Sequence, residues 1–438
     1  MSEWPRLQRL PLEVPREVGT HYVVRGVPPR LRKDVLSQFC VKQRHNPYVR
    51  VQPKPLVLAH EDGELLHLPR AGGEQLFGPA PRAREWQGGS PLAADMLLPL
   101  RPHQQAAVTQ VVATLARTPQ VMLQAPCGGG KTTTSIAIAL QLGVKTLVLV
   151  HTSVLLRQWV ERVGSTCSAS VSVVQGKKVD TSGDFIVAME QTLATGKDVD
   201  LSGVGLTIFD EAHHAPCNFL RLALRVPCLL LGLSATPRRD TDGTTPALWY
   251  MFGDRVVMDA PRPTVRVFWH ALPSADVRMM RIGDKPLYVQ TRKRLAEHPR
   301  RQAALEALLL RLRDEGRKVL ALTDFVEHAE LTAAAVDGLA VHGGNSRKVD
   351  AEGALAAGKV VVATHALVKE GTDWAAVDTM VWLLPPAFSA MEQTVGRLRP
   401  RGGGFEPQVH DCTDMALDES RRAAFYRKHG CVFEPTHQ

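Results

Sequence analysis

Short apolar runs, separated by turn residues and helical stretches, constrain the fold of this 438-residue chain more than any other feature. Runs that are apolar at every position are typical of strands covered on both faces, because a strand with one face in water alternates apolar and polar residues. The first set comprises VMLQ (121–124), KTLVLV (145–150), FIVAM (185–189), LTIF (206–209) and CLLLGL (228–233). We therefore predict an α/β domain here, with a parallel sheet flanked by helices.

A second set of apolar runs indicates another α/β domain of similar size closer to the C-terminus. Its members are TVRVFWH (264–270), KVLALT (318–323), KVVVA (359–363) and TMVWLL (379–384). Between the first two of them, the segment RRQAALEALLLRLR predicts a helix over residues 300–313. The predicted boundaries of the two α/β domains are residues 96–262 and 263–438.

The region before the first α/β domain has a different composition. Residues 1–95 are rich in Pro, Arg and Gly, and the segment 68–91 predicts a loop or linker. Between Arg25 and Lys54 the chain carries eight Lys or Arg residues and a single acid, Asp34. We expect a small basic accessory domain, whose charge fits either nucleic-acid binding or a solvated face that caps the neighbouring domain.

Charge, hydropathy and cysteine usage narrow the class of protein. The formal net charge of +9 favours a polyanionic partner. No apolar stretch is long enough for a membrane span, and the first residues lack the apolar core of a signal peptide. The seven cysteines are scattered and form no CxxC pair, so we expect a reduced cytoplasmic protein without membrane association.

A glycine-rich turn follows the first apolar run and opens a helical stretch. In APCGGGKTTTSIAIAL (125–140), the pattern GxxxxGK[ST] is met except for Ala125 at its first position. Backbone N–H groups of such a turn hold an anion at a helix N-terminus, where Lys131 would reach the β- and γ-phosphates and Thr132 would ligate Mg²⁺. The predicted nucleotide-binding residues of this loop are Ala125, Pro126, Cys127, Gly128, Gly129, Gly130, Lys131, Thr132 and Thr133.

Two carboxylates and two histidines follow a later strand in TIFDEAHHAP (207–216). Adjacent charges at a strand end need a cation nearby. A nucleotide-borne Mg²⁺ meets this need, with Asp210 holding the metal through water and Glu211 polarising the attacking water. A zinc site is disfavoured, because ligands at neighbouring positions of one loop give poor tetrahedral geometry.

Further motifs flank these two in a fixed order and resemble those of superfamily 2 DEAD/DEAH-box helicases. They include LRPHQQAAV (100–108), VLVHTSVLLRQW (148–159), VAMEQTL (187–193), DEAH (210–213), SAT (234–236), VLALTDFVEHAEL (319–331), ATHALVKEGTDW (363–374) and QTVGRLRPR (393–401). Within the superfamily the chain resembles XPB-like and UvsW-like DNA helicases, with their phage and poxvirus relatives, most strongly.

The resemblance implies two tandem RecA-like domains with ATP between them. Gln104 or Gln105 would read adenine, and Asp373, Gln393 and Arg397 would reach the nucleotide from the second domain. The second arginine of the last motif falls on Pro400, so Arg399, or Arg401 on its other side, would replace it. The resemblance assigns coupling to His213, Ser234 and Thr236, and nucleic-acid contacts to Thr152, Ser153, Arg157, Gln191, Thr192, Thr364 and Lys369.

The predicted function is an ATP- and Mg²⁺-dependent DNA helicase or translocase in repair, recombination or replication. It would act as a monomer or weak oligomer in a bacterial or phage-infected cytoplasm. A duplex translocase that does not separate strands, an RNA helicase, and a binding module without turnover remain alternatives.

Overall fold

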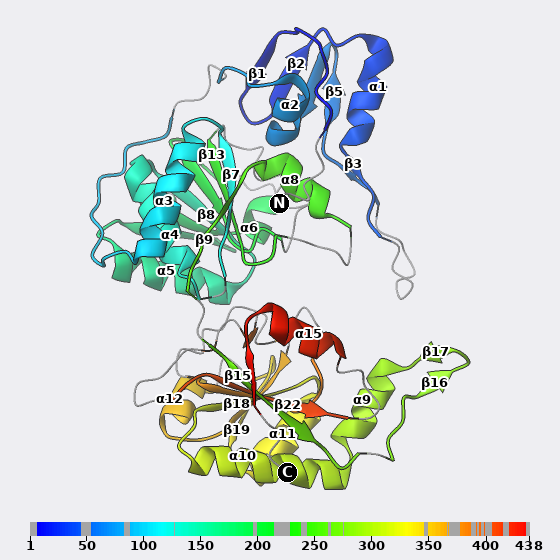
Figure 1. Ribbon diagram of the computed structural model, residues 1–438. Coiled ribbons are helices and arrows are strands. Elements are labelled where there is room, and N and C mark those ends of the chain that lie inside the picture. Colours follow the sequence, from blue (N-terminus) through cyan, green and yellow to red (C-terminus); the bar gives the residue numbers. More distant parts are fainter. Residues whose placement is uncertain are drawn as a thin grey trace. The chain divides into compact units, whose positions relative to one another are not determined.

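The computed structural model describes residues 7–44, 54–82, 88–126, 128–195, 199–213, 228–237, 243–261, 264–274, 276–345, 349–365, 367, 377–386, 391, 394–395, 398, 405–414 and 420–434. The chain divides into two compact units, Met1–Ala260 and Pro261–Gln438. Each unit has its own large sheet with helices packed on it (Figure 1). Across these described stretches, every helix is too short or too polar to cross a bilayer.

The first unit contains an eight-stranded sheet with the order β10-β9-β11-β8-β12-β13-β7-β14. All neighbours are parallel except β10 and β9. The strands are β7 (Gln120–Gln124), β8 (Thr146–Val150), β9 (Val171–Gln175), β10 (Lys178–Val179), β11 (Phe185–Met189), β12 (Leu206–Phe209), β13 (Leu229–Ser234) and β14 (Arg255–Val257). Every apolar run predicted in this region forms a strand, which confirms the parallel sheet.

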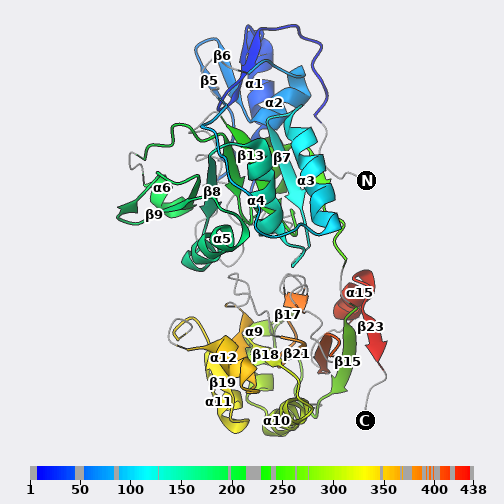
Figure 2. The same cartoon turned by 90° about the vertical axis from the view of Figure 1, so that its left-hand side faces the viewer.

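Alternate side chains of this sheet enter two different cores. Val121 and Leu123 of β7 pack on one face with the helices α3 (Pro102–Leu115), α4 (Lys131–Leu142) and α5 (Ser153–Thr166). Figure 2 shows α3 and α4 side by side over the strands. Met122 points to the opposite face, where α8 (Thr245–Phe252) packs. Burial on both faces explains why these strands contain no polar alternation.

A small antiparallel sheet from the N-terminal region shares that second core. Its order is β1-β2-β6-β5, and Val24 and Leu66 are buried in the same cluster as Met122. The Arg70 guanidinium donates from Nη1 to the carbonyl of Cys228 at 2.6 Å, which joins the start of α2 to the residue before β13. The elements are β1 (Arg16–Val18), β2 (Tyr22–Arg25), α1 (Pro29–Gln38), β3 (Cys40–Val41), β4 (Leu56–Val57), β5 (His60–Asp62), β6 (Leu65–Leu68) and α2 (Arg70–Phe77).

The prediction of a loop over residues 68–91 is wrong for its first part, which forms α2. Glycines usually disfavour helices, but a Cβ atom at Gly72 would collide with the ring of Phe39. A Cβ atom at Gly73 would collide with the Tyr22 side chain. These glycines therefore permit close packing of α2 and are not turn residues.

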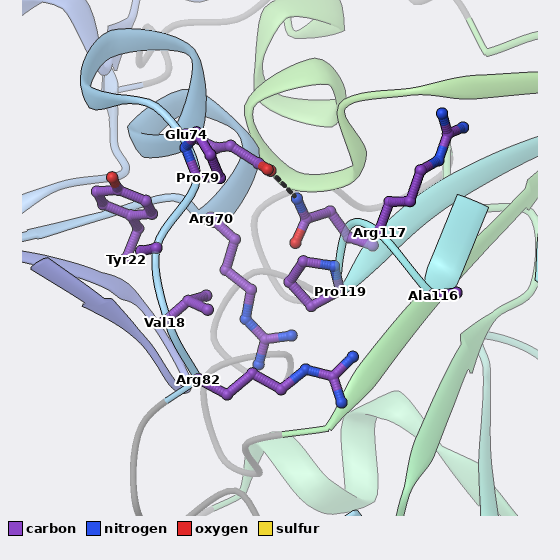
Figure 3. A pocket seen from close by; sticks show the side chains of 11 residues that line it. Val18, Tyr22, Arg70, Glu74, Pro79, Arg82, Ala116, Arg117 and Pro119 are labelled. Atoms are coloured by element: carbon purple, nitrogen blue, oxygen red, sulfur yellow. Dashed lines mark hydrogen bonds between the residues drawn. The ribbon is translucent and has the colours of Figure 1, made fainter. Parts of the chain in front are cut away.

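A cavity of about 290 Å³ lies where the small sheet meets the first α/β domain (Figure 3). Tyr22, Arg70 and Glu74 line it from the N-terminal region. Gln120, at the start of β7, donates from Nε2 to Glu74 Oε2 at 3.2 Å across this junction. The cavity is thus at the opposite end of β7 from the glycine-rich turn, and it is separate from the predicted nucleotide site.

The second unit contains a seven-stranded sheet with the order β19-β20-β18-β21-β22-β15-β23, parallel throughout. The predicted strands appear, and the predicted helix 300–313 is α10. The elements are β15 (Arg266–Ala271), β16 (Arg281–Ile282), β17 (Lys285–Pro286), α9 (Tyr288–Ala296), α10 (Pro299–Asp314), β18 (Val319–Thr323), α11 (Val326–Ala335), β19 (Leu339–Val341), α12 (Ala351–Ala356), β20 (Val361–Thr364), β21 (Thr379–Trp382), β22 (Gln408–Thr413), α15 (Ser420–Lys428) and β23 (Val432–Glu434). Short α6 (Glu190–Ala194) belongs to the first unit.

Candidate functional site

The glycine-rich turn joins the end of β7 to the start of α4, as predicted. Gly128 and Gly130 have φ values of 71° and 85°, in the left-handed region that side chains disfavour. Gly130 is also the N-cap of α4, and a Cβ atom there would collide with the amide of Gln104. Both requirements select glycine at this position. Cys127 lies outside the described residues.

The structure distinguishes the two glutamines that precede the turn. Gln104 is buried, and its Nε2 donates to the carbonyl of Gly130 at 3.5 Å. Its Oε1 accepts from the backbone N–H of Arg101 at 2.8 Å, which fixes the side chain at the start of α3. Gln105 is exposed. The geometry therefore brings Gln104, and not Gln105, against the turn.

The acidic pair follows β12 directly and faces the first turn of α4. Lys131 Nζ lies 3.0 Å from Glu211 Oε1, and the two side chains are 12% and 25% exposed. Glu211 has a φ of 46°, an uncommon conformation for a residue with a side chain. Such backbone strain is concentrated at functional sites in proteins. The predicted phosphate-binding lysine and water-activating glutamate thus meet at one end of the sheet.

Asp210 is held by two N–H donors. Its Oδ2 accepts from the indole Nε1 of Trp159 at 2.8 Å, and its Oδ1 accepts from the backbone N–H of Glu211 at 3.0 Å. The side chain is only 6% exposed. Burial, followed by the adjacent Glu211 carboxylate, raises the pKa of Asp210 to about 6. A cation brought near this carboxylate would favour its ionised form.

Polar contacts continue from the acidic pair to the SAT segment. His213 Nδ1 lies 3.4 Å from Glu211 Oε2 and 2.9 Å from Ser234 Oγ. Ser234 Oγ also accepts from the backbone N–H of Thr236 at 3.1 Å. Ser234 returns to the turn, because its carbonyl accepts from the N–H of Ala125 at 3.1 Å. The residues predicted to couple the site therefore form one connected network with it.

The oxygen donors at this end of the sheet fit a Mg²⁺ ion that arrives with a nucleotide. Thr132, with Thr133, lies in the first turn of α4, next to Lys131, which contacts Glu211, the neighbour of Asp210. Mg²⁺ prefers oxygen ligands and is usually held by few protein groups together with phosphates. Among the residues that the structure describes, no cluster of three or more His, Cys, Asp or Glu side chains could hold a metal by itself.

The predicted nucleic-acid contacts of the first unit lie after β8 and β11, at the same end of the sheet. Thr152 caps α5 by accepting from the N–H of Leu155 at 3.3 Å, Ser153 begins that helix, and Arg157 is exposed. Gln191 Nε2 donates to the carbonyl of His151 at 2.9 Å. The Thr192 hydroxyl is buried and accepts from the N–H of Gly176 at 2.9 Å. Its side chain therefore serves local structure.

In the second unit, Thr364 is the one predicted site residue that lies within the described part of the chain. Thr364 ends β20 and is buried. The remaining ones, Lys369, Asp373, Gln393, Arg397 and Arg399, lie outside the described residues, as does Arg401. Their roles stay predictions.

Trp159 is a site residue that we did not predict. It stands in the quoted run VLVHTSVLLRQW, but a tryptophan on the apolar side of a helix usually signals core packing. The signal in the sequence was weak, because nothing in the spacing shows that the indole reaches the strand bearing Asp210.

Residues 97–239 match the family described as type III restriction enzyme, res subunit. A candidate ATP-dependent RNA helicase of Acanthamoeba polyphaga mimivirus is 27% identical over 344 residues, which cover 74% of this chain and 66% of that protein. A candidate helicase of frog virus 3 is 28% identical over 408 residues, covering 85% and 87%. A candidate DNA 3'-5' helicase, Rad25, of Halobacterium salinarum is 28% identical over 286 residues, covering 59% of this chain and 44% of that protein.

Solved structures show the same fold. A fragment of a candidate HsdR subunit of a type I restriction enzyme from Vibrio vulnificus has a TM-score of 0.55 at 18% identity, covering 76% of this chain and 68% of that one. The Hef helicase domain of Pyrococcus furiosus has a TM-score of 0.50 at 17% identity, covering 75% and 98%. The predicted fold class, tandem RecA-like domains with parallel sheets flanked by helices, is confirmed.

Proposed function

We propose that this chain couples ATP hydrolysis to movement along DNA and to unwinding or remodelling of that DNA, since it is a helicase of the superfamily 2 type. Repair, recombination or replication is the proposed setting, in a bacterial or phage-infected cytoplasm. The observation that carries the proposal is the contact between Lys131 and Glu211 beside the buried Asp210.

The first unit supplies the phosphate-binding half of the proposed site. The γ-phosphate of ATP competes with Glu211 for the Lys131 ammonium, and its arrival releases Glu211 to orient the attacking water. Backbone N–H groups of the turn bind the remaining phosphate oxygens. Thr132 and Asp210 would hold a Mg²⁺ ion bound with the nucleotide, and this ion would neutralise the charge that develops on the transferred group.

The second unit supplies the proposed arginines. Arg397, together with Arg399 in place of the absent arginine at Pro400, stabilises the transition-state charge when the domains close. Such an arginine is worth on the order of 10³–10⁵ in rate, so hydrolysis depends on closure. Gln393 and Asp373 contact the nucleotide from the same side. Phosphate release reopens the domains, and this alternation moves the chain along a strand.

The proposed grip on DNA is directed at the backbone. Aromatic residues make up 5% of the chain, too few for a long platform of stacked bases. Phosphate contacts by Ser153, Arg157, Gln191 and the second-unit residue Lys369 position a strand without reading its sequence. The proposed domains are the N-terminal accessory domain, residues 1–95, and the two RecA-like domains, residues 96–262 and 263–438.

We assign the basic N-terminal region an accessory role in binding duplex DNA. Arg25, Arg30, Lys33, Lys42 and Arg44 are exposed. Cation–phosphate contacts of this kind add affinity that falls steeply with salt. The shared core with the first α/β domain supports a structural role for the same region, and the two roles are compatible.

ATP turnover tests the proposal directly. We expect low turnover by the protein alone and strong stimulation by single-stranded, duplex or branched DNA, with a weaker response to RNA of matched length. If RNA alone stimulated turnover, the substrate would be RNA and not DNA. Absence of ATP turnover under all these conditions would leave only a nucleotide-dependent binding module.

A duplex translocase that does not separate strands is the second candidate function. The proposed backbone-directed grip is equally compatible with it, because such contacts follow duplex and single strands alike. Forked and four-way DNA substrates distinguish the two, since unwinding releases single strands whereas translocation alone displaces only a bound obstacle.

A further inference from the structure

A hydrogen bond between Trp159 and Asp210 connects the proposed nucleic-acid side of the first unit to its metal side. Trp159 belongs to α5, the helix that begins at Ser153 after the capping residue Thr152. Asp210 follows β12, which pairs with β8, the strand that leads into α5. The indole N–H therefore spans from a helix that would contact DNA to the carboxylate that would serve Mg²⁺.

The burial of both partners makes this contact strong. Trp159 is 1% exposed and Asp210 is 6% exposed. A buried indole N–H needs an acceptor, and a carbonyl or hydroxyl would satisfy it. Here the acceptor is a carboxylate with little contact to water, and hydrogen bonds to charged groups are stronger than those between neutral groups. Core packing alone does not require this choice of acceptor.

The two donors to Asp210 together fix the plane of its carboxylate. Glu211 N–H binds Oδ1 and Trp159 Nε1 binds Oδ2. The second side-chain torsion of aspartate is broad, so a single donor leaves the carboxylate free to rotate. Removal of the indole N–H would therefore release the oxygen that is held from α5, while the backbone donor would stay.

We propose that Trp159 is a positioning residue that orients Asp210 for the nucleotide-borne divalent cation and makes this orientation depend on the position of α5. The inference rests on the proposed function, because it assigns Asp210 to the metal. Binding of DNA at Ser153 and Arg157 would shift α5, and the indole would pass that shift to the carboxylate. Trp159 thereby contributes to the stimulation of ATP turnover by DNA.

The substitution Trp159→Phe tests this role, because it keeps an aromatic ring in the core and removes the N–H. We would titrate Mn²⁺ into the full chain with ADP and follow free Mn²⁺ by electron paramagnetic resonance. The expected result is a Kd for Mn²⁺ raised about tenfold, at the lower end of the effect of losing a hydrogen bond to a charged group. In ATP turnover, the Mg²⁺ concentration for half-maximal rate rises, and the stimulation by DNA falls.

Trp382→Phe is the matched control. Trp382 is also fully buried, and its Nε1 donates to the Tyr426 hydroxyl at 3.0 Å in the second unit. The substitution removes the same N–H from a core that does not contain Asp210. Its Kd for Mn²⁺ should equal that of the wild-type protein, whereas a tenfold rise in both variants would attribute the effect to general loss of stability.

Unchanged Mn²⁺ affinity in folded Trp159→Phe would overturn the inference. If that variant does not fold, 3-benzothienylalanine at position 159 keeps the bicyclic volume and lacks the N–H, and the same Kd comparison applies. Failure of the proposed function has a different signature, namely wild-type protein that shows no Mg²⁺-dependent ATP turnover. If the wild-type protein hydrolyses ATP and the variant binds Mn²⁺ as tightly as the wild-type protein, only the role of Trp159 is refuted.

Discussion

Glu190 lies at the sheet end that carries the proposed nucleic-acid contacts, and its burial predicts a pH dependence of the unfolding free energy. It follows β11, is 4% exposed, and its Oε2 has no hydrogen-bond partner within the described part of the chain. Burial raises the pKa of this carboxyl from the ordinary value of 4.5 to about 7. The folded protein therefore binds this proton more tightly than the unfolded chain does.

The sign and the size of the pH dependence of the unfolding free energy follow from this difference in pKa. The stabilising effect of the proton is fully present below pH 4.5, and it is lost as the pH rises through about 7. The loss amounts to about 3 kcal/mol for this single group. Glu190→Gln removes the titrating group and so removes this dependence. The variant should gain about 3 kcal/mol in unfolding free energy relative to wild type between pH 4.5 and pH 8.

Chemical unfolding of the first unit, followed at pH 4.5 and pH 8, measures the change. Glu161→Gln is the matched control, because Glu161 is an exposed glutamate of α5. Comparison of the two variants separates the effect of the buried carboxyl from the general effect of replacing a glutamate by a glutamine. A Glu190→Gln variant whose stability relative to wild type is the same at both pH values would show that burial does not raise the pKa of Glu190.

Three further predictions concern the site and the fold. Glu211→Gln should retain binding of ATP but lower turnover by about 10²–10⁴, measured by phosphate release, and normal turnover would remove Glu211 from the role of base. Arg399→Ala and Arg401→Ala, made separately, should show that Arg399 supports DNA-stimulated hydrolysis and Arg401 does not; the reverse result would assign the second arginine to Arg401, and no effect from either would refute the replacement. Gly73→Ala should lower the melting temperature, because the added methyl group overlaps Tyr22, and an unchanged temperature would show that α2 has room to shift.

The sequence was sufficient for the strands that lie inside the sheets. β8 and β12 are buried at every position, and the free energy gained by burying both faces produces the continuous apolar runs that identify them. The phosphate-binding turn was equally predictable, since only glycine readily adopts the φ values found at Gly128 and Gly130.

Elements whose burial depends on distant partners were not predictable. β22 is buried but reads QVHDCT, and its Asp411 accepts from the Tyr426 hydroxyl at 2.8 Å and from Arg422 Nε at 3.1 Å. Residues of α15 thus form hydrogen bonds with the Asp411 carboxylate. Without these partners, a charged residue at this position would predict that the segment is not a central strand. The contact of Trp159 with Asp210 escaped prediction for the same reason, because its partners are brought together by tertiary structure.

We propose that residues of both units assemble one ATP site. The most direct measurement is a crystal or cryo-EM structure of the full chain with DNA, Mg²⁺ and a transition-state analogue such as ADP with aluminium fluoride. We predict that Lys131 and Arg397 both contact the phosphate mimic. A nucleotide held by the turn at Gly128–Lys131 with Arg397 directed away from it, in a complex that hydrolyses ATP in solution, would contradict the account.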